Sequence, residues 1–172
     1  FRLSKISRGL LMVCWRVPVI VFASVWKWIF AGDGSGILNY FLTQLHIVKA
    51  PVSWLTTERG AMTALIITNI WRGVPFNMLL LATGLTTLPE ELFEAAAIDG
   101  ANRIQRFRHI TLPLLKPTIL SVVTLGFIYT FKAFDLIYIM TNGGPFDSTQ
   151  ILATAYYKLT FSNFEFGQGS AV

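Results

Sequence analysis

Three apolar runs, each long enough to cross a lipid bilayer, limit the folds that this chain can adopt. They cover residues 10–30, 61–85 and 118–140. A transmembrane helix needs about 20 mainly apolar residues, and in lipid every backbone polar group must be paired within the protein. Each run meets the length that a helix requires. The sequence therefore predicts an all-α fold, a polytopic bundle of membrane helices.

The composition supports a membrane protein and argues against other classes. Charged residues make up 13% of the chain, against roughly 25% in soluble domains. The net charge of +5 comes from basic residues scattered beside the apolar runs, so we expect no nucleic acid as partner. Cys14 is the only cysteine, and neither His46 nor His109 has a ligand motif around it, so we expect no metal site.

Sequence motifs of enzyme active sites are missing from the chain. It has no HExxH helix, no nucleophile elbow, no paired catalytic carboxylates and no glycine-rich phosphate loop with its lysine. We therefore predict no catalytic residues, no cofactor and no enzymatic activity. Any ATP chemistry linked to this chain is expected on another chain.

A polar segment, residues 89–117, separates the second and third apolar runs. Thr87 and Glu90 have the spacing of a capping box, which predicts the start of a short helix. Gly100 is suited to end that helix, because glycine adopts the left-handed backbone at no steric cost. The segment is thus expected to begin with one short helix and a sharp turn.

A second short helix is expected after the turn. Asn102 and Gln105 can cap its N-terminus, and it should extend from Arg103 to about Ile110. Pro113, followed by a further proline four residues later, should close it because proline disrupts a helix interior.

Lysines and arginines are distributed unequally over the two sides of the predicted bundle. Seven of them fall on the side of the N-terminus and the 89–117 segment: Arg2, Lys5, Arg8, Arg103, Arg106, Arg108 and Lys116. The opposite side has three: Lys49, Arg59 and Lys158. Cytoplasmic loops of membrane proteins carry the excess of basic residues, so we expect the 89–117 segment in the cytoplasm.

Several polar residues interrupt the apolar runs. Asn69 either faces a pathway through the bundle or bonds to another helix, and the sequence leaves both interpretations open. Lys132 and Asp135 are three residues apart, so they are expected to pair on one helical face. Pro18 is expected to kink the first run.

The 89–117 segment resembles the EAA loop of ATP-binding-cassette (ABC) importer permeases. The match rests on Glu94-Ala95-Ala96, Gly100, Ile110 and Leu112-Pro113, which agree with that loop at every fixed position. In the family the loop is cytoplasmic, and its first helix docks into a cleft on the ATPase subunit. The resemblance implies that the ATPase-coupling residues are Glu94, Ala95, Ala96, Asp99, Gly100, Ile110, Leu112 and Pro113.

Much of the remaining chain resembles the carbohydrate-uptake branch of these permeases, which includes maltose and glycerol-phosphate importers. The signs are residues 26–30 (WKWIF), 36–39 (GILN) and 141–145 (TNGGP), and the last is similar to the first permease of a two-permease pair. The resemblance implies the type I ABC importer permease fold. Residues 1–172 would then be a partial permease domain with its C-terminal helix truncated.

This resemblance also implies partners and a location. The expected partners are a second permease subunit in a heterodimer, an ABC ATPase dimer, an extracytoplasmic solute-binding protein, a sugar substrate and the lipid bilayer. The expected location is the bacterial or archaeal inner membrane, which the chain would cross several times.

Alignment with the maltose type further implies a substrate pathway. The residues are Asn69, Gly73 and Phe76 on one helix, and Gly126, Tyr129, Thr130 and Ala133 on the next. The spacings within each set put its members on one helical face. Three other functions remain open: a permease for another solute such as an amino acid, phosphate or polyamine, a membrane-embedded enzyme, or a structural scaffold.

Overall fold

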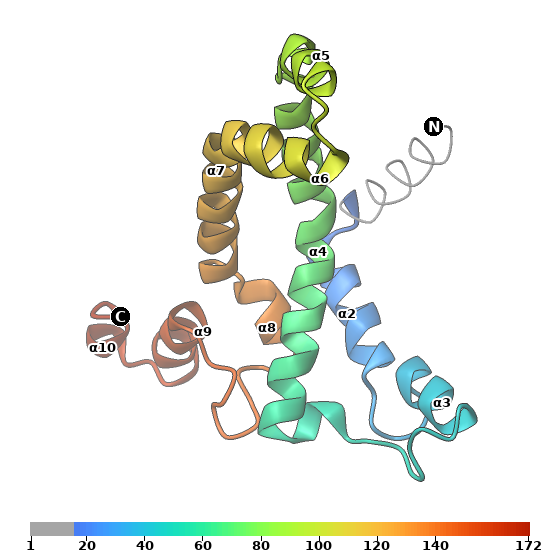
Figure 1. Ribbon diagram of the computed structural model, residues 1–172. Coiled ribbons are helices and arrows are strands. Elements are labelled where there is room, and N and C mark those ends of the chain that lie inside the picture. Colours follow the sequence, from blue (N-terminus) through green and yellow to red (C-terminus); the bar gives the residue numbers. More distant parts are fainter. Residues whose placement is uncertain (1–15) are drawn as a thin grey trace. The chain divides into compact units, whose positions relative to one another are not determined.

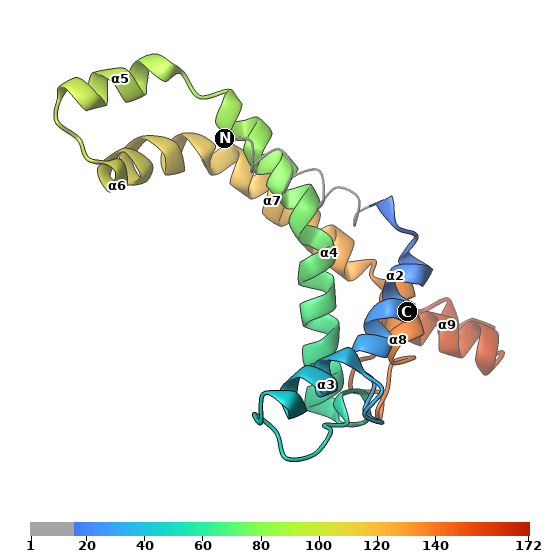
Figure 2. The ribbon, with the colours of Figure 1, turned by 90° about the vertical axis from the view of Figure 1, so that its right-hand side faces the viewer.

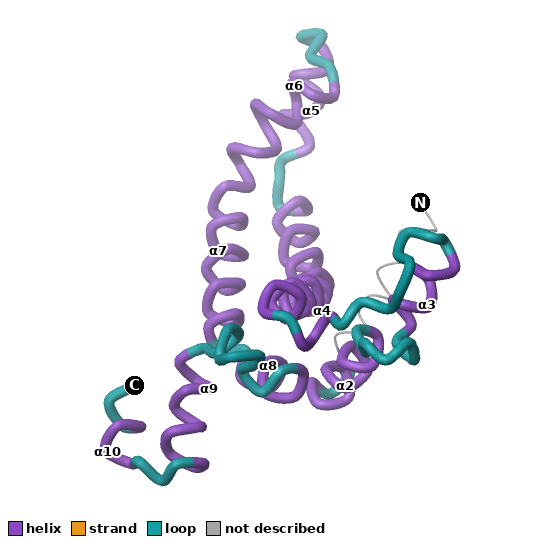
Figure 3. The backbone as a smooth tube through the Cα atoms, turned by 90° about the horizontal axis from the view of Figure 1, so that it is seen from below, coloured by secondary structure: helices purple, strands orange, loops and turns teal. Residues whose placement is uncertain are grey.

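The computed structural model describes residues 16–172, and all regular structure within that range is helical (Figure 3). The predicted all-α class is therefore confirmed. The described residues form two compact units. Residues 73–129 make up the hairpin unit, and residues 16–72 with 130–172 make up the core unit.

Two long helices each contribute to both units. Helix α4 (Glu58–Thr86) begins in the core unit and ends in the hairpin unit, and helix α7 (Leu112–Phe131) begins in the hairpin unit and ends in the core unit. The other elements of the hairpin unit are α5 (Glu90–Ile98), α6 (Arg103–Arg106) and the π-helical turn η2 (Phe107–Thr111). Those of the core unit are α2 (Val19–Ile29), α3 (Ile37–Gln44), the 3₁₀ turn η1 (Trp54–Thr56), α8 (Phe134–Met140), α9 (Leu152–Tyr157), the π-helical turn η3 (Lys158–Ser162) and α10 (Phe166–Gly169).

Two helical segments within the described range are long and apolar enough to cross a membrane. The first is α4, which contains the whole predicted run 61–85 and continues through Pro75. The second is the continuous helical segment from Arg103 to Phe131. By length and composition these two segments are the membrane-crossing candidates.

The predicted end of the second loop helix at Pro113 is wrong. In η2, the Leu112 backbone N–H bonds to the Phe107 oxygen, and α7 follows without a break. In a regular α-helix the ring of Pro113 would clash with the carbonyl four residues earlier. The wider π-helical turn lies directly before this proline, so the helix passes it and enters the apolar run.

The third run is also divided differently from the prediction of 118–140. Its helix ends at Phe131, and a new helix, α8, starts only at Phe134. Lys132 and Asp135 therefore do not share one helical face. The predicted pair between them is wrong, since the only ion pair among residues 16–172 joins Lys158 to Asp147 at 3.0 Å.

The first run also differs from the prediction, at Pro18. Its residues 10–15 lie outside the described range. Pro18 is not a kink inside a helix but the residue that precedes α2. Proline is suited to this place because its missing N–H would have no partner in a first turn. The 11 residues of α2 are too few for a complete crossing by that helix alone.

Helix α2 packs against α8 in the centre of the core unit (Figure 1). The buried cluster consists of Phe22, Ala23, Phe30, Ala64, Leu65, Leu136, Ile137 and Met140. Trp26 extends it, with its ring 5.8 Å from that of Phe30 and 6.2 Å from that of Trp71. Trp26 and Phe30 therefore pack within the protein, whereas Trp28 is exposed.

Asn39 fixes the segment between α2 and α4. Its side chain is only 1% exposed. Its amide nitrogen donates to the carbonyls of Ala31 and Val52, both at 2.9 Å. Its amide oxygen accepts from the Val52 N–H at 3.0 Å and from the Trp54 indole at 3.1 Å. One side chain thereby ties α3 to residues on both sides of it.

Candidate functional site

The turn after α5 has the geometry that the sequence predicts. Gly100 has a φ of +77°. Its N–H bonds to the Ala97 carbonyl at 3.1 Å, and the Ala101 N–H bonds to the Ala96 carbonyl at 2.9 Å. This pair of bonds is a Schellman motif, which satisfies the last carbonyls of a helix. The predicted left-handed glycine is confirmed.

The second helix of the hairpin starts as expected. The Gln105 N–H donates to the Asn102 side chain at 2.9 Å, and the Asn102 N–H donates to the Gln105 side chain at 2.8 Å. The predicted cap by Thr87 is wrong, because the Thr87 hydroxyl donates to the Gly84 carbonyl at 2.8 Å, and Pro89 is the residue before α5. The Thr87 side chain thus bonds to the last turn of α4 and does not cap α5.

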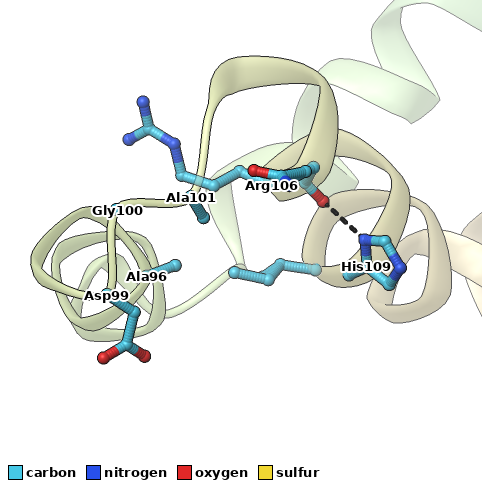
Figure 4. Close-up of a pocket in the computed structure, with 8 residues that line it drawn as sticks. Ala96, Asp99, Gly100, Ala101, Arg106 and His109 are labelled. Atoms are coloured by element: carbon cyan, nitrogen blue, oxygen red, sulfur yellow. Dashed lines mark hydrogen bonds between the residues drawn. The ribbon is translucent and has the colours of Figure 1, made fainter.

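After the Gly100 turn the chain returns in α6 alongside α5, and the two helices form a hairpin (Figure 2). A surface hollow of about 330 Å³ lies between them (Figure 4). Its lining is Ala96, Asp99, Gly100, Ala101, Gln105, Arg106, His109 and Ile110. The structure therefore brings together Ala96, Asp99, Gly100 and Ile110 of the predicted coupling residues.

Polar groups surround the hollow without closing it. The Asp99 carboxylate and the Arg106 guanidinium point to opposite sides of the Gly100 turn (Figure 4). The His109 ring Nδ1 lies 3.1 Å from the Gln105 carbonyl, which holds the imidazole against its own helix (Figure 4). A partner side chain could therefore enter the hollow without breaking an internal ion pair.

The other predicted coupling residues lie outside the hollow. Glu94 and Ala95 are exposed on α5, and Leu112 and Pro113 are exposed at the start of α7. None of these four residues lines the hollow, although the Ala95 carbonyl accepts a hydrogen bond from the Asp99 N–H at 3.0 Å. They can touch a partner only over a wider surface of the hairpin unit.

The hairpin also has an apolar tip that was not predicted from the sequence, and we define it as Ile98, Ile104 and Phe107. Ile98 is 87% exposed and Ile104 is 76% exposed, and Phe107 is exposed as well. Helix α5 has no buried residue at all. An apolar surface that the chain does not cover is typical of an interaction site. The isoleucines next to the Gly100 turn could have indicated it.

The predicted pathway residues of the hairpin unit include an aromatic pair. The rings of Phe76 and Tyr129 meet edge to face, with centroids 5.8 Å apart and an interplanar angle of 88°. A Cβ added at Gly126 would find no atom within 4 Å, and one at Gly73 would touch only the Asn77 amide, at 3.5 Å. These glycines therefore leave space beside α4 and α7.

The predicted pathway residues of the core unit include a polar pair. The Asn69 amide donates to the Thr130 hydroxyl at 3.2 Å, and Thr130 is exposed while Asn69 is half-buried. Ala133 does not share the helical face predicted for it, because α7 ends two residues before it, and its side chain is buried. The bond between Asn69 and Thr130 supports helix-to-helix contact, and the Asn69 amide is only partly covered.

Family comparison identifies the group of proteins to which the chain is related. The family described as "binding-protein-dependent transport system inner membrane component" matches residues 1–172. The chain belongs to this family. The hairpin, the broken third run and the exposed hairpin tip therefore belong to an inner membrane component of a binding-protein-dependent transport system.

Two relatives and one solved structure show the range of similarity. This permease is 39% identical to a probable ABC transporter permease of Brucella suis, over 98% of the chain and 58% of that protein. It is also 39% identical to the trehalose/maltose transport system permease protein MalF of Thermococcus litoralis, over 97% of the chain and 55% of that protein. The chain thus spans little more than half the length of these relatives.

The fold is shared with a solved bacterial transporter. The chain superimposes with a TM-score of 0.85 on a bacterial alginate ABC transporter in complex with an alginate pentasaccharide-bound periplasmic protein. The match covers 97% of this permease and 57% of that chain, at 21% identity. It establishes the fold of ABC importer permeases for the present chain.

Proposed function

We propose that this permease is a multi-pass subunit of an ATP-driven sugar importer in a bacterial or archaeal inner membrane. Its partners are a second permease, an ATPase dimer on the cytoplasmic side and a solute-binding protein on the outer side. The chain itself carries out no chemistry. It contributes part of the translocation pathway and transmits ATPase closure through the hairpin.

The main support for this proposal is the exposed surface of the hairpin. Its apolar tip and its hollow both adjoin the Gly100 turn, and small residues on α5 allow close approach of a partner. Interface residues with large buried apolar side chains dominate binding energy. Ile98 and Ile104 would supply such contacts to the ATPase, while Gly100 sets the angle between the two helices.

The proposed substrate class rests on the pathway chemistry and on the names of relatives. The pair Phe76–Tyr129 offers aromatic faces for the carbon side of a sugar ring, and Asn69 and Thr130 offer hydrogen bonds for its hydroxyls. We propose that each of these two pairs contacts the solute. Ala133 is not proposed as a contact, because its side chain is buried. The Thermococcus relative named for trehalose and maltose supports a sugar.

Transport by the complete complex in lipid vesicles tests this function. The full-length permease, its partner permease and the ATPase are reconstituted with ATP inside and the binding protein with labelled trehalose or maltose outside. Uptake that requires both ATP and the binding protein supports the proposal. Uptake without either of them would contradict it, as would hydrolysis of ATP by the permease alone.

Replacing Tyr129 with alanine is expected to weaken sugar uptake. Loss of one well-placed aromatic contact is worth on the order of 1–2 kcal/mol, so the sugar concentration for half-maximal uptake should rise about tenfold. The measurement is uptake at graded concentrations of sugar-loaded binding protein and sugar, with assembly checked by copurification.

Phe127→Ala is the matched control for Tyr129→Ala. It removes a ring of similar size two residues away, on the opposite side of α7. It should leave the concentration dependence near that of the wild type. Equal effects of both variants would remove Tyr129 from the pathway.

A further inference from the structure

The loop between α8 and α9, residues 141–150, is held rigidly by side-chain hydrogen bonds. At its centre is Thr149, which is buried. The Thr149 hydroxyl donates to the Gly144 carbonyl at 2.7 Å and lies 2.8 Å from the Thr141 hydroxyl. The Thr149 N–H bonds to the Gly143 carbonyl at 3.1 Å. Both ends of the loop are thus fixed to each other.

Two lysines brace this loop from neighbouring elements. The Lys27 ammonium on α2 donates to the Ile139 carbonyl at 3.0 Å, in the last turn of α8. The Lys158 ammonium contacts both carboxylate oxygens of Asp147, at 3.0 and 3.2 Å. The loop is therefore anchored at its start and beside its tip.

The rigid loop presents one aromatic side chain to its surroundings. Phe146 is 90% exposed, and no ring of residues 16–172 is found in contact with it. Phe146 and Asp147 have φ values of +51° and +56°. A residue with a Cβ in this region is disfavoured by roughly 1–2 kcal/mol. The loop network thus maintains an unfavourable backbone that displays a large apolar ring.

We propose that Phe146 is an anchor by which the solute-binding protein docks on the outer face of the permease. This inference rests on the proposed function, from which the binding protein comes. The helical segment from Arg103 to Phe131 is long enough to cross the membrane. Because the basic hairpin at its start is cytoplasmic under the positive-inside rule, the loop after α8 belongs to the outer side.

The surroundings of Phe146 favour a protein partner over lipid. The Asp147–Lys158 pair is about half exposed on both sides, and Gln150 adds a polar side chain to the same loop. A rigid aromatic residue within a polar rim is the arrangement of a protein-binding hot spot. Preorganisation of the loop also reduces the entropy lost on binding. The complementary site is an apolar pocket on the binding protein.

A titration with the binding protein tests this anchor. ATP hydrolysis is measured in vesicles that hold the full-length complex, at increasing concentrations of sugar-loaded binding protein. With Phe146→Ala, the concentration for half-maximal stimulation should rise about tenfold, whereas the maximal rate should be approached at saturation. Phe146→Leu should show a smaller rise. A titration with Phe146→Ala that equals the wild type overturns the inference.

Phe164→Ala is the matched control. Phe164 is 71% exposed and has a φ of +59°, but its ring lies 6.4 Å from that of Phe166 and so has a partner within the chain. It follows the same loop on the same side of the membrane. Its truncation should leave the half-maximal concentration at the wild-type value, and a rise equal to that of Phe146→Ala would contradict a specific anchor.

Photocrosslinking identifies the occupant. With a benzophenone amino acid in place of Phe146, an adduct with the binding protein supports the inference. Adducts only with lipid, with the second permease or with the permease itself overturn it, and so does the absence of any adduct. Failure of the proposed function is distinguishable, because the wild-type complex would then show no stimulation by the binding protein at all.

Discussion

Replacement of Gly100 by leucine is expected to abolish coupled transport while the permease still inserts into the membrane. The φ of +77° disfavours a residue with a Cβ by roughly 1–2 kcal/mol. A Cβ at this position meets no atom of the chain within 4 Å, so internal packing does not oppose the change. The effect must therefore come from a changed turn or from collision with the ATPase surface.

Sugar uptake and binding-protein-stimulated ATP hydrolysis in vesicles measure this effect. Gly34→Leu is the matched control, because Gly34 also has a left-handed φ, of +82°, but lies in the segment between α2 and α3. Gly100→Asn should retain part of the coupling, since asparagine adopts this backbone more readily. Wild-type uptake and stimulation with Gly100→Leu would reduce the hairpin to a simple connector.

Asn39→Leu is expected to destabilise the core unit strongly, although leucine has a similar size. The exchange removes four hydrogen bonds and leaves the partners at Ala31, Val52 and Trp54 unpaired in a part-buried place. Each unpaired buried group costs about 1–3 kcal/mol. Each kcal/mol lowers the melting temperature of a protein of this size by about 2–4 °C.

Thermal unfolding of the purified full-length permease in detergent measures the loss. Gln44→Leu serves as the control, because it also replaces an amide on α3, at an exposed position. A fall of several degrees for Asn39→Leu with little change for Gln44→Leu is expected. Equal melting temperatures for the two variants would show that the Asn39 bonds do not hold this segment.

Local rules predicted much of the hairpin. The left-handed Gly100 and the mutual cap of Asn102 and Gln105 follow from backbone preference and side-chain chemistry within six residues, so the sequence was sufficient for them. The length of the second apolar run likewise predicted the position of α4. These features depend on neighbours in the chain and not on distant contacts.

Irregularities within the long helical segments escaped prediction. The passage of the helix through Pro113 needs the π-helical turn before it, and no propensity rule indicates such a turn. The break after Phe131 separates Lys132 from Asp135 and removes Ala133 from the helical face assigned to it. Short-range spacing suggested both assignments and could not reveal the break.

The candidate sites show the same division. A spaced motif predicts coupling residues near Gly100, but the exposure of Ile98 and Ile104 is seen only once α5 is folded. The role of Asn39 depends on Val52 and Trp54, more than ten residues away. Likewise, Phe146 stands out only because the hydrogen bonds of Thr149 fix the loop beneath it.

Side-specific labelling of single cysteines decides whether the hairpin and the proposed docking side face opposite compartments. In a permease with Cys14 and every other native cysteine replaced by serine, Ile104→Cys and Gln44→Cys each place one thiol at an exposed position, on α6 and α3. Both variants are treated in intact cells with a membrane-impermeant maleimide, and reactivity is verified after denaturation. We predict labelling of Gln44→Cys from outside, and labelling of Ile104→Cys only after the membrane is opened. Ready labelling of Ile104→Cys from outside, with none of Gln44→Cys, would reverse the topology and contradict both the ATPase docking and the outer anchor.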